Sequence, residues 1–142
     1  ALEDAGVPCA SLDGSDAGVF VGLSGFDYAL AHVGGSGQMD SQAISGNAHS
    51  IAANRMSYLW GLRGPSLAVD TGCSAGLVAV HLACGAIQRG ECGIALVGAA
   101  NVILAPDVTL AFVSLGALSA DGKCRRLHAG AFGMVLPPCR RA

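Results

Sequence analysis

The sequence has little charge, few aromatic residues and no long apolar run. Charged residues make up 13% and aromatic residues 5% of the 142 residues, whereas ordinary soluble domains carry about 25% charged residues. The net charge of -2 provides no basic surface for nucleic acid or an anionic membrane. The longest apolar stretch, 77–87, is 11 residues long, whereas a membrane span needs roughly 20. We therefore expect no nucleic-acid partner, no membrane span, and a surface that is largely covered.

The six cysteines also lack the spacing of a metal site. They include no C-x-x-C pair, and the histidines form no cluster at ligand spacing. Most of the cysteines lie among apolar or small residues, where a free cysteine acts as a small core residue. We expect this of Cys84 and Cys92, and we expect no structural metal. Unpaired cysteines point to a reducing, cytoplasmic compartment.

What the sequence does contain is an alternation of apolar runs and helical patterns, which predicts an α/β fold. The predicted strands cover 19–23, 66–70 and 93–100, and the predicted helices cover 47–60, 74–89 and 106–118. The continuous apolar character of the third strand is typical of a parallel sheet. Strand, helix and strand over 66–100 predict a right-handed βαβ unit. The chain is thus expected to form a mostly parallel sheet flanked by helices.

The helical patterns predict which residues are buried. In the helix at 47–60, residues at i, i+1, i+4, i+7 and i+8 predict one buried face: Ile51, Ala52, Arg55, Tyr58 and Leu59. Arg55 on this face is a candidate ion-pair partner for a carboxylate such as Asp70. The helix at 74–89 is apolar nearly all round, so we expect it to be central.

Cys73 is the strongest candidate for a catalytic residue. An extended apolar run ends at Asp70 and a helical pattern begins at about Ser74, which places Cys73 at a strand-to-helix corner. Backbone N–H groups and the helix dipole at such a corner favour the thiolate. The small neighbouring residues allow a substrate to approach closely. We predict that Cys73 is a nucleophile and that its own backbone N–H contributes to an oxyanion hole.

None of the four histidines is assigned as a base for Cys73. His81 lies eight residues further along the sequence, which is about 12 Å in a helix, whereas direct hydrogen bonding needs about 3 Å. We expect His81 to be a packing residue. His49 is expected to have a structural role or to approach a neighbouring loop or a dimer seam. His32 and His128 are expected to be exposed.

The segment GPSLAVDTGCS at 64–74 strongly resembles the β-ketoacyl synthase (ketosynthase) domains of modular type I polyketide synthases. Further matching segments follow in the family's order: ALEDAG at 1–6, GNAHSIAANR at 46–55, LVAVHLAC at 77–84, RGEC at 89–92, GAANV at 98–102 and LSADGKC at 118–124. The resemblance covers 1–126. It implies a thiolase-like fold, of which this chain is an incomplete N-terminal half.

The resemblance also implies an activity. In this family the active-site cysteine, here Cys73, holds an acyl chain as a thioester. A carbanion formed by decarboxylation of a malonyl-type unit on acyl carrier protein then attacks that thioester, a decarboxylative Claisen condensation. The implied partners are acyl carrier protein, acyl and malonyl-type thioesters and a second copy of the chain. No cofactor is implied, because the phosphopantetheine arm belongs to the carrier protein. Polyketide, fatty-acid and hybrid pathways all stay open.

Part of the family's machinery is missing from this sequence. The two histidines and the lysine that ketosynthases use lie in the second half of the domain, outside this chain. We therefore expect the isolated chain to be inactive and to bind, dimerise or aggregate instead. Substrate-binding residues are not identified, since 102–118 could line an acyl tunnel or form ordinary core.

The sequence departs from the family pattern in two places. The family usually reads T-A-C-S-S where this chain has Thr71-Gly72-Cys73-Ser74-Ala75, which keeps every residue small. The second departure is the tail at 127–142, which lacks the family's acidic residues and contains two prolines that block a central strand. We expect a ketosynthase fragment at 1–126 and a divergent, frame-shifted or artificially ended tail. The helix-end pattern at 1–6 likewise predicts a piece of a longer chain.

One alternative belongs to another catalytic class. Gly72-Cys73-Ser74-Ala75-Gly76 also satisfies G-x-S-x-G, the nucleophile elbow of serine hydrolases. Ser74 would then be the nucleophile, and Asp107 or Asp121 followed by His128 would complete a triad. A five-residue pattern is a weaker signal than the long collinear resemblance to ketosynthases.

Overall fold

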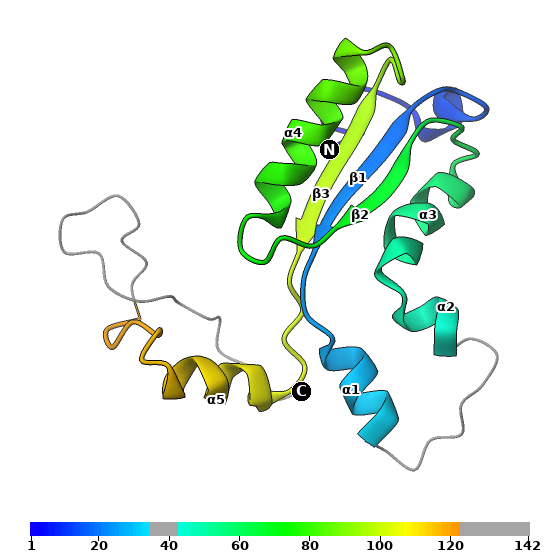
Figure 1. The fold of residues 1–142 in the computed structure, drawn as a ribbon. Coiled ribbons are helices and arrows are strands. Elements are labelled where there is room, and N and C mark those ends of the chain that lie inside the picture. Colours follow the sequence, from blue (N-terminus) through cyan, green and yellow to red (C-terminus); the bar gives the residue numbers. More distant parts are fainter. Residues whose placement is uncertain (35–42, 123–142) are drawn as a thin grey trace. The chain divides into compact units, whose positions relative to one another are not determined.

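The computed structural model describes residues 1–34 and 43–122. The chain divides into two units, one containing 1–26 and 36–101 and the other 27–35 and 102–142. In chain order the elements are η1 (Cys9–Leu12), β1 (Gly18–Leu23), α1 (Asp27–Gly34), α2 (Ala43–Asn47), α3 (His49–Leu59), β2 (Ser66–Val69), α4 (Ala75–Gln88), β3 (Ala95–Ala100) and α5 (Pro106–Ser114). The first unit holds the sheet and the second holds α1 and α5 (Figure 1).

The sheet of the first unit is parallel throughout, with strand order β2-β1-β3. All three strands were predicted from their apolar runs, and each lies within about two residues of its predicted bounds. The register pairs Gly22 of β1 with Val69 of β2 and with Ala99 of β3. The βαβ connection from β2 through α4 to β3 therefore crosses β1, which lies in the centre. All three strands end at the same edge of the sheet.

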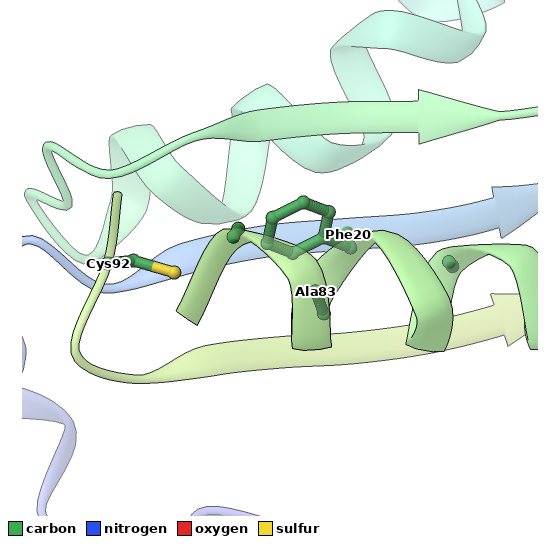
Figure 2. Close-up of a cluster of buried hydrophobic side chains, with 5 residues drawn as sticks. Phe20, Ala83 and Cys92 are labelled. Carbon is green, nitrogen blue, oxygen red and sulfur yellow. The ribbon is translucent and has the colours of Figure 1, made fainter. Parts of the chain in front are cut away.

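Alternate residues of β1 face opposite sides of the sheet and pack against different helices. Phe20 packs with α4 and with Cys92 in one cluster (Figure 2). Val19 and Val21 pack with Ala53 of α3 in another. Because successive side chains of a strand point to opposite faces, α3 and α4 cover opposite faces of the sheet. The apolar run of β1 is explained by this burial on both sides.

Helix α4 packs on the sheet through its smallest side chains. Its buried residues recur at helical spacing: Ala75, Ala79, Ala83 and Ala86. His81 and Cys84 lie off this stripe and are exposed, so the predictions that they are core residues were wrong. The described residues also do not bury α4 on all sides, as expected of a central helix, since Leu77 on its outer face is 78% exposed. Cys92 is buried as predicted.

Helix α3 also buries small residues, and its predicted buried face was wrong. Ala53 and Ser57 are buried, and the Ser57 hydroxyl donates a hydrogen bond to Oγ of Ser66 at 2.8 Å. Tyr58 is 90% exposed, and Arg55 is also exposed. Close approach of a helix to a sheet selects small side chains, and the apolar pattern of the sequence emphasised the large ones.

The second unit contains α1, which the sequence analysis did not predict, and α5. The carboxylate of Asp27, in the first turn of α1, accepts hydrogen bonds from the backbone N–H groups of Leu104 (3.1 Å) and Ala105 (3.3 Å). These bonds hold the segment that leads into α5. The predicted helix at 106–118 ends earlier, at Ser114, and none of the residues of α5 is buried. This disagrees with the expectation that 102–118 could form ordinary core.

Several expectations fall on residues that the structure does not describe. The tail at 127–142 and His128 lie outside the described residues, as does the His32 side chain. In the two described ranges, no helix combines the length and the apolar character that a membrane span requires.

Gly22 allows α4 to approach the sheet, and this contact can be tested. A Cβ at Gly22 would lie 2.6 Å from the carbonyl carbon of Ala75 and 2.7 Å from the backbone nitrogen of Gly76. We expect Gly22→Ala to lower the free energy of unfolding by about 1–3 kcal/mol through overpacking, measured by urea denaturation. Gly98→Ala is the matched control, because a Cβ there meets nothing within 4 Å among the described residues. Equal losses in both variants would contradict this account of the packing.

Candidate active site

Cys73 lies where the sequence analysis placed it, at the corner between β2 and α4. Strand β2 ends at Val69, and α4 begins at Ala75 with Ser74 as its N-cap. The corner requires a positive φ of 61° at Gly72, a conformation that glycine adopts at little cost. Cys73 follows directly and is a free, exposed cysteine. Its thiol is therefore accessible at the start of a helix.

Asp70 and Ser24 hold the peptide that precedes Cys73. The backbone N–H of Gly72 donates to Oδ1 of Asp70 at 3.0 Å, and the Ser24 hydroxyl donates to the same oxygen at 2.6 Å. The carbonyl of Gly72 accepts the backbone N–H of Ala75 at 3.0 Å. Both ends of the Gly72 residue are thus fixed, one by a side chain and one by the first turn of α4. We call Ser24, Asp70 and Gly72 the corner clasp.

Ser74 closes the other side of the corner. Its hydroxyl lies 2.8 Å from the carbonyl oxygen of Thr71 and 2.9 Å from Oγ1 of Thr71. The Ser74 hydroxyl proton is directed to a local acceptor in this arrangement, as in a structural turn. A serine nucleophile would instead present its oxygen to a base. The local geometry therefore favours a structural role for Ser74.

The partners of Asp70 lower the pKa of its carboxyl group below the ordinary value of 3.8. The largest cause is the hydrogen bond from Ser24, followed by that from the Gly72 N–H, and the charge of His49 adds a smaller effect in the same direction. All three favour the ionised form. The proposed ion pair between Arg55 and Asp70 was wrong, because Asp70 is bound by the corner clasp and Arg55 is exposed.

His49 fixes the loop that contains Ser24. Its Nε2 lies 2.9 Å from the carbonyl oxygen of Gly25, and because a carbonyl only accepts, Nε2 carries the proton. The imidazole ring stacks on Phe26 with centroids 4.6 Å apart. Of the roles considered from sequence, approach to a neighbouring loop is confirmed.

Ser24 is the site residue that the sequence analysis missed. It directly follows the strand predicted at 19–23 and belongs to no motif. The available signal was the prediction of parallel strands, because residues that follow adjacent parallel strands meet at one edge of the sheet. Ser24 follows β1 and Asp70 follows β2, and these strands are hydrogen-bonded neighbours.

The site contains no arrangement that indicates a resident metal. Within residues 1–34 and 43–122, no three His, Cys, Asp or Glu side chains are grouped so that they could hold an ion.

If the corner clasp forms as described, the pKa of Asp70 depends on the Ser24 hydroxyl, and this dependence can be measured. Ser24→Ala removes the largest cause of the lowering, so we expect the Asp70 pKa to rise toward 3.8, read by carboxyl-carbon NMR titration. Because the folded-state pKa is lowered, the clasp stabilises the fold above the ordinary pKa. That stabilisation is lost as the pH falls through the folded-state value. Ser11→Ala, which removes a serine bound to the carbonyl of Pro8, should leave the Asp70 titration unchanged, and an unmoved Asp70 pKa in Ser24→Ala would contradict the clasp.

Comparison with known proteins identifies the family. Residues 1–137 match the family model "Beta-ketoacyl synthase, N-terminal domain". The chain is 44% identical over 133 residues to the highly reducing polyketide synthase dmxL2 of Cryptosporiopsis sp. (strain 8999), covering 94% of this chain and 6% of that protein. It is 45% identical over 135 residues to a phenolphthiocerol/phthiocerol polyketide synthase protein of Mycobacterium tuberculosis, covering 95% of this chain and 7% of that protein. The chain therefore spans less than a tenth of the length of these relatives.

Solved structures give the same result. The oxazolomycin ketosynthase domain OzmH KS7 of Streptomyces albus JA3453 is 41% identical with a TM-score of 0.79, covering 94% of this chain and 23% of that one. The ketosynthase from module 6 of the bacillaene synthase of Bacillus subtilis 168 is 35% identical with a TM-score of 0.79, covering 95% and 22%. The serine-hydrolase alternative finds no support, and the thiolase-like α/β fold is confirmed. The chain belongs to the β-ketoacyl synthase family, as part of its N-terminal domain.

Proposed function

We propose that this chain supplies the nucleophile of a β-ketoacyl synthase that forms carbon–carbon bonds by decarboxylative Claisen condensation. The observation that carries the proposal is the exposed Cys73 at the strand-to-helix corner, in a chain that belongs to the ketosynthase family. The 142 residues span 22–23% of the ketosynthase chains they resemble. The reaction is therefore that of the longer protein.

The first step is loading of the acyl group. The Cys73 thiolate attacks the carbonyl carbon of an acyl thioester, a new carbon–sulfur bond forms, and the donor's thiolate leaves. Negative charge develops on the carbonyl oxygen during the attack. We propose that the backbone N–H of Cys73 forms part of the oxyanion hole that stabilises this charge. Cys73 directly precedes Ser74, the N-cap of α4.

The second step is extension of the chain. A malonyl-type unit on acyl carrier protein loses carbon dioxide, and the electron pair left on its α-carbon attacks the acyl carbonyl. The carbon–sulfur bond to Cys73 breaks and the thiolate is regenerated, so the step needs no oxidant or reductant. Family resemblance assigns the decarboxylation to two histidines and a lysine in the second half of the domain. No histidine of this chain is given that role.

The remaining parts of the proposal concern partners and location. The acyl carrier protein delivers both thioesters through its own phosphopantetheine arm, so the ketosynthase itself uses no metal or cofactor. The parent protein acts as a homodimer in the cytoplasm.

The relatives are polyketide synthases, which favours polyketide over fatty-acid biosynthesis. We propose 1–126 as the ketosynthase portion and 127–142 as a divergent tail, whereas the family match extends to residue 137; resequencing of the parent gene would test the boundary.

The role of Cys73 can be tested by acyl loading of the parent synthase. We expect Cys73→Ala to abolish loading, because the sulfur atom proposed to form the thioester is removed. Cys73→Ser should load poorly, since an alcohol is a far weaker nucleophile than a thiolate near neutral pH. Cys9→Ala is the matched control, because Cys9 is also a free, exposed cysteine, in η1 and away from the corner. Intact-protein mass spectrometry reads the acyl adduct, and wild-type loading in Cys73→Ala would refute the role.

The isolated 142-residue chain provides a second test. We expect it to show no condensation with a malonyl-type unit on acyl carrier protein, because the proposed decarboxylation machinery lies outside the chain. The assay is product detection by mass spectrometry, with the intact parent synthase as the positive control. Turnover by the isolated chain would show that its own side chains suffice for decarboxylation.

A further inference from the structure

The corner clasp contains one side chain from outside the segment that carries Cys73. Asp70 and Gly72 belong to the loop between β2 and α4, but Ser24 follows β1 and lies 46 residues before Asp70 in sequence. Its hydroxyl donates to Oδ1 of Asp70 at 2.6 Å, and the carbonyl oxygen of Gly72 lies 3.3 Å from the same hydroxyl. Ser24 thus contacts both groups that set the direction of the chain just before Cys73.

Ser24 is itself held on both sides, as a positioning residue must be. Strand β1 ends immediately before it, and residues 18–22 of that strand are buried. The next residue, Gly25, accepts a hydrogen bond from His49, whose ring stacks on Phe26. The Ser24 backbone is therefore fixed between the central strand and the start of α3. A hydroxyl in such a place can hold Asp70 without losing much conformational freedom of its own.

We propose that Ser24 is a positioning residue for Cys73, which acts by holding the Asp70 carboxylate on the Gly72 N–H and away from the thiol. The inference rests on the proposed function of Cys73 and adds a residue that acts through the corner. With its two donors in place, Asp70 stabilises the positive φ of Gly72. Without the hydroxyl, the exposed carboxylate is tied only by the Gly72 N–H and can rotate toward Cys73. A negative charge close to a thiol disfavours the thiolate.

The proposal predicts the direction of a change in thiol reactivity. Ser24→Ala in the parent synthase should slow alkylation of Cys73 by iodoacetamide about fivefold to tenfold. This is the kinetic equivalent of the net contribution of one ordinary hydrogen bond. Cys9 in the same molecule, a free and exposed cysteine of η1, is the internal reference, with peptide mass spectrometry reading both adducts. Simple loosening of the corner would leave Cys73 alkylation unchanged or faster, and either result would overturn the proposal.

Matched variants separate positioning from other roles. Ser24→Thr keeps the hydroxyl and should give the wild-type alkylation rate. Ser11→Ala removes a serine whose hydroxyl donates to the carbonyl of Pro8, outside the corner clasp, and should have no effect on that rate. If Ser24 acts through Asp70, then Ser24→Ala should change little in an Asp70→Asn background, because the charge it controls is gone. An unrescued Ser24→Thr, or a full additive effect in the double variant, would contradict the mechanism.

Acyl loading distinguishes this proposal from the proposed function. We expect Ser24→Ala to lower kcat for loading with KM unchanged. A raised KM with kcat unchanged would mean that Ser24 touches the substrate, which overturns a positioning role. If Cys73→Ala still loads acyl groups, the proposed nucleophile is wrong. The alkylation ratio of Cys73 to Cys9 still decides whether Ser24 positions the thiol, because that measurement needs no acyl chemistry.

Discussion

The structure depends on one close contact, between the first turn of α4 and the central strand. Gly22 has no side chain, and the backbone of Ala75 and Gly76 occupies the space that a Cβ would take. Interiors pack at the density of organic crystals, so the start of α4 cannot move closer to β1 without a clash or further away without leaving a void. Cys73 lies two residues before Ala75, and its position relative to the sheet follows from the same contact.

The exposed apolar surface and the low charge of the chain have a common interpretation. Leu77 on α4 and both Tyr58 and Leu59 on α3 are 72–90% exposed, on faces that point away from the sheet. Monomeric proteins rarely expose such groups together. The chain spans less than a quarter of the ketosynthase chains it resembles. We interpret these faces as surfaces that the rest of the longer protein covers. A covered surface needs fewer charged side chains to stay in contact with water, which accounts for the low charged fraction of 13%.

The strands, their parallel arrangement and the corner at Cys73 could be predicted from the sequence, because each depends on local signals. Apolar runs bounded by glycine mark strands, and the change at Asp70 and Thr71 marks the corner. The buried faces of the helices could not be predicted in the same way. Periodicity weights large side chains, but Ala53 in α3 and the alanine stripe of α4 form the contacts with the sheet. The short distance between helix and sheet selects these residues, and that distance is not a local property of the sequence.

Ser24 shows why part of the site could not be found from a motif. A motif records residues that are close in sequence, whereas the partner of Asp70 is supplied by the neighbouring strand through the register that pairs Gly22 with Val69. That pairing brings the residues that follow β1 and β2 to one edge of the sheet. A shift of one residue in this register would move the Ser24 hydroxyl by about 3.3 Å, beyond hydrogen-bonding reach of Asp70. The reactivity of the corner therefore depends on strand pairing as much as on the residues beside the thiol.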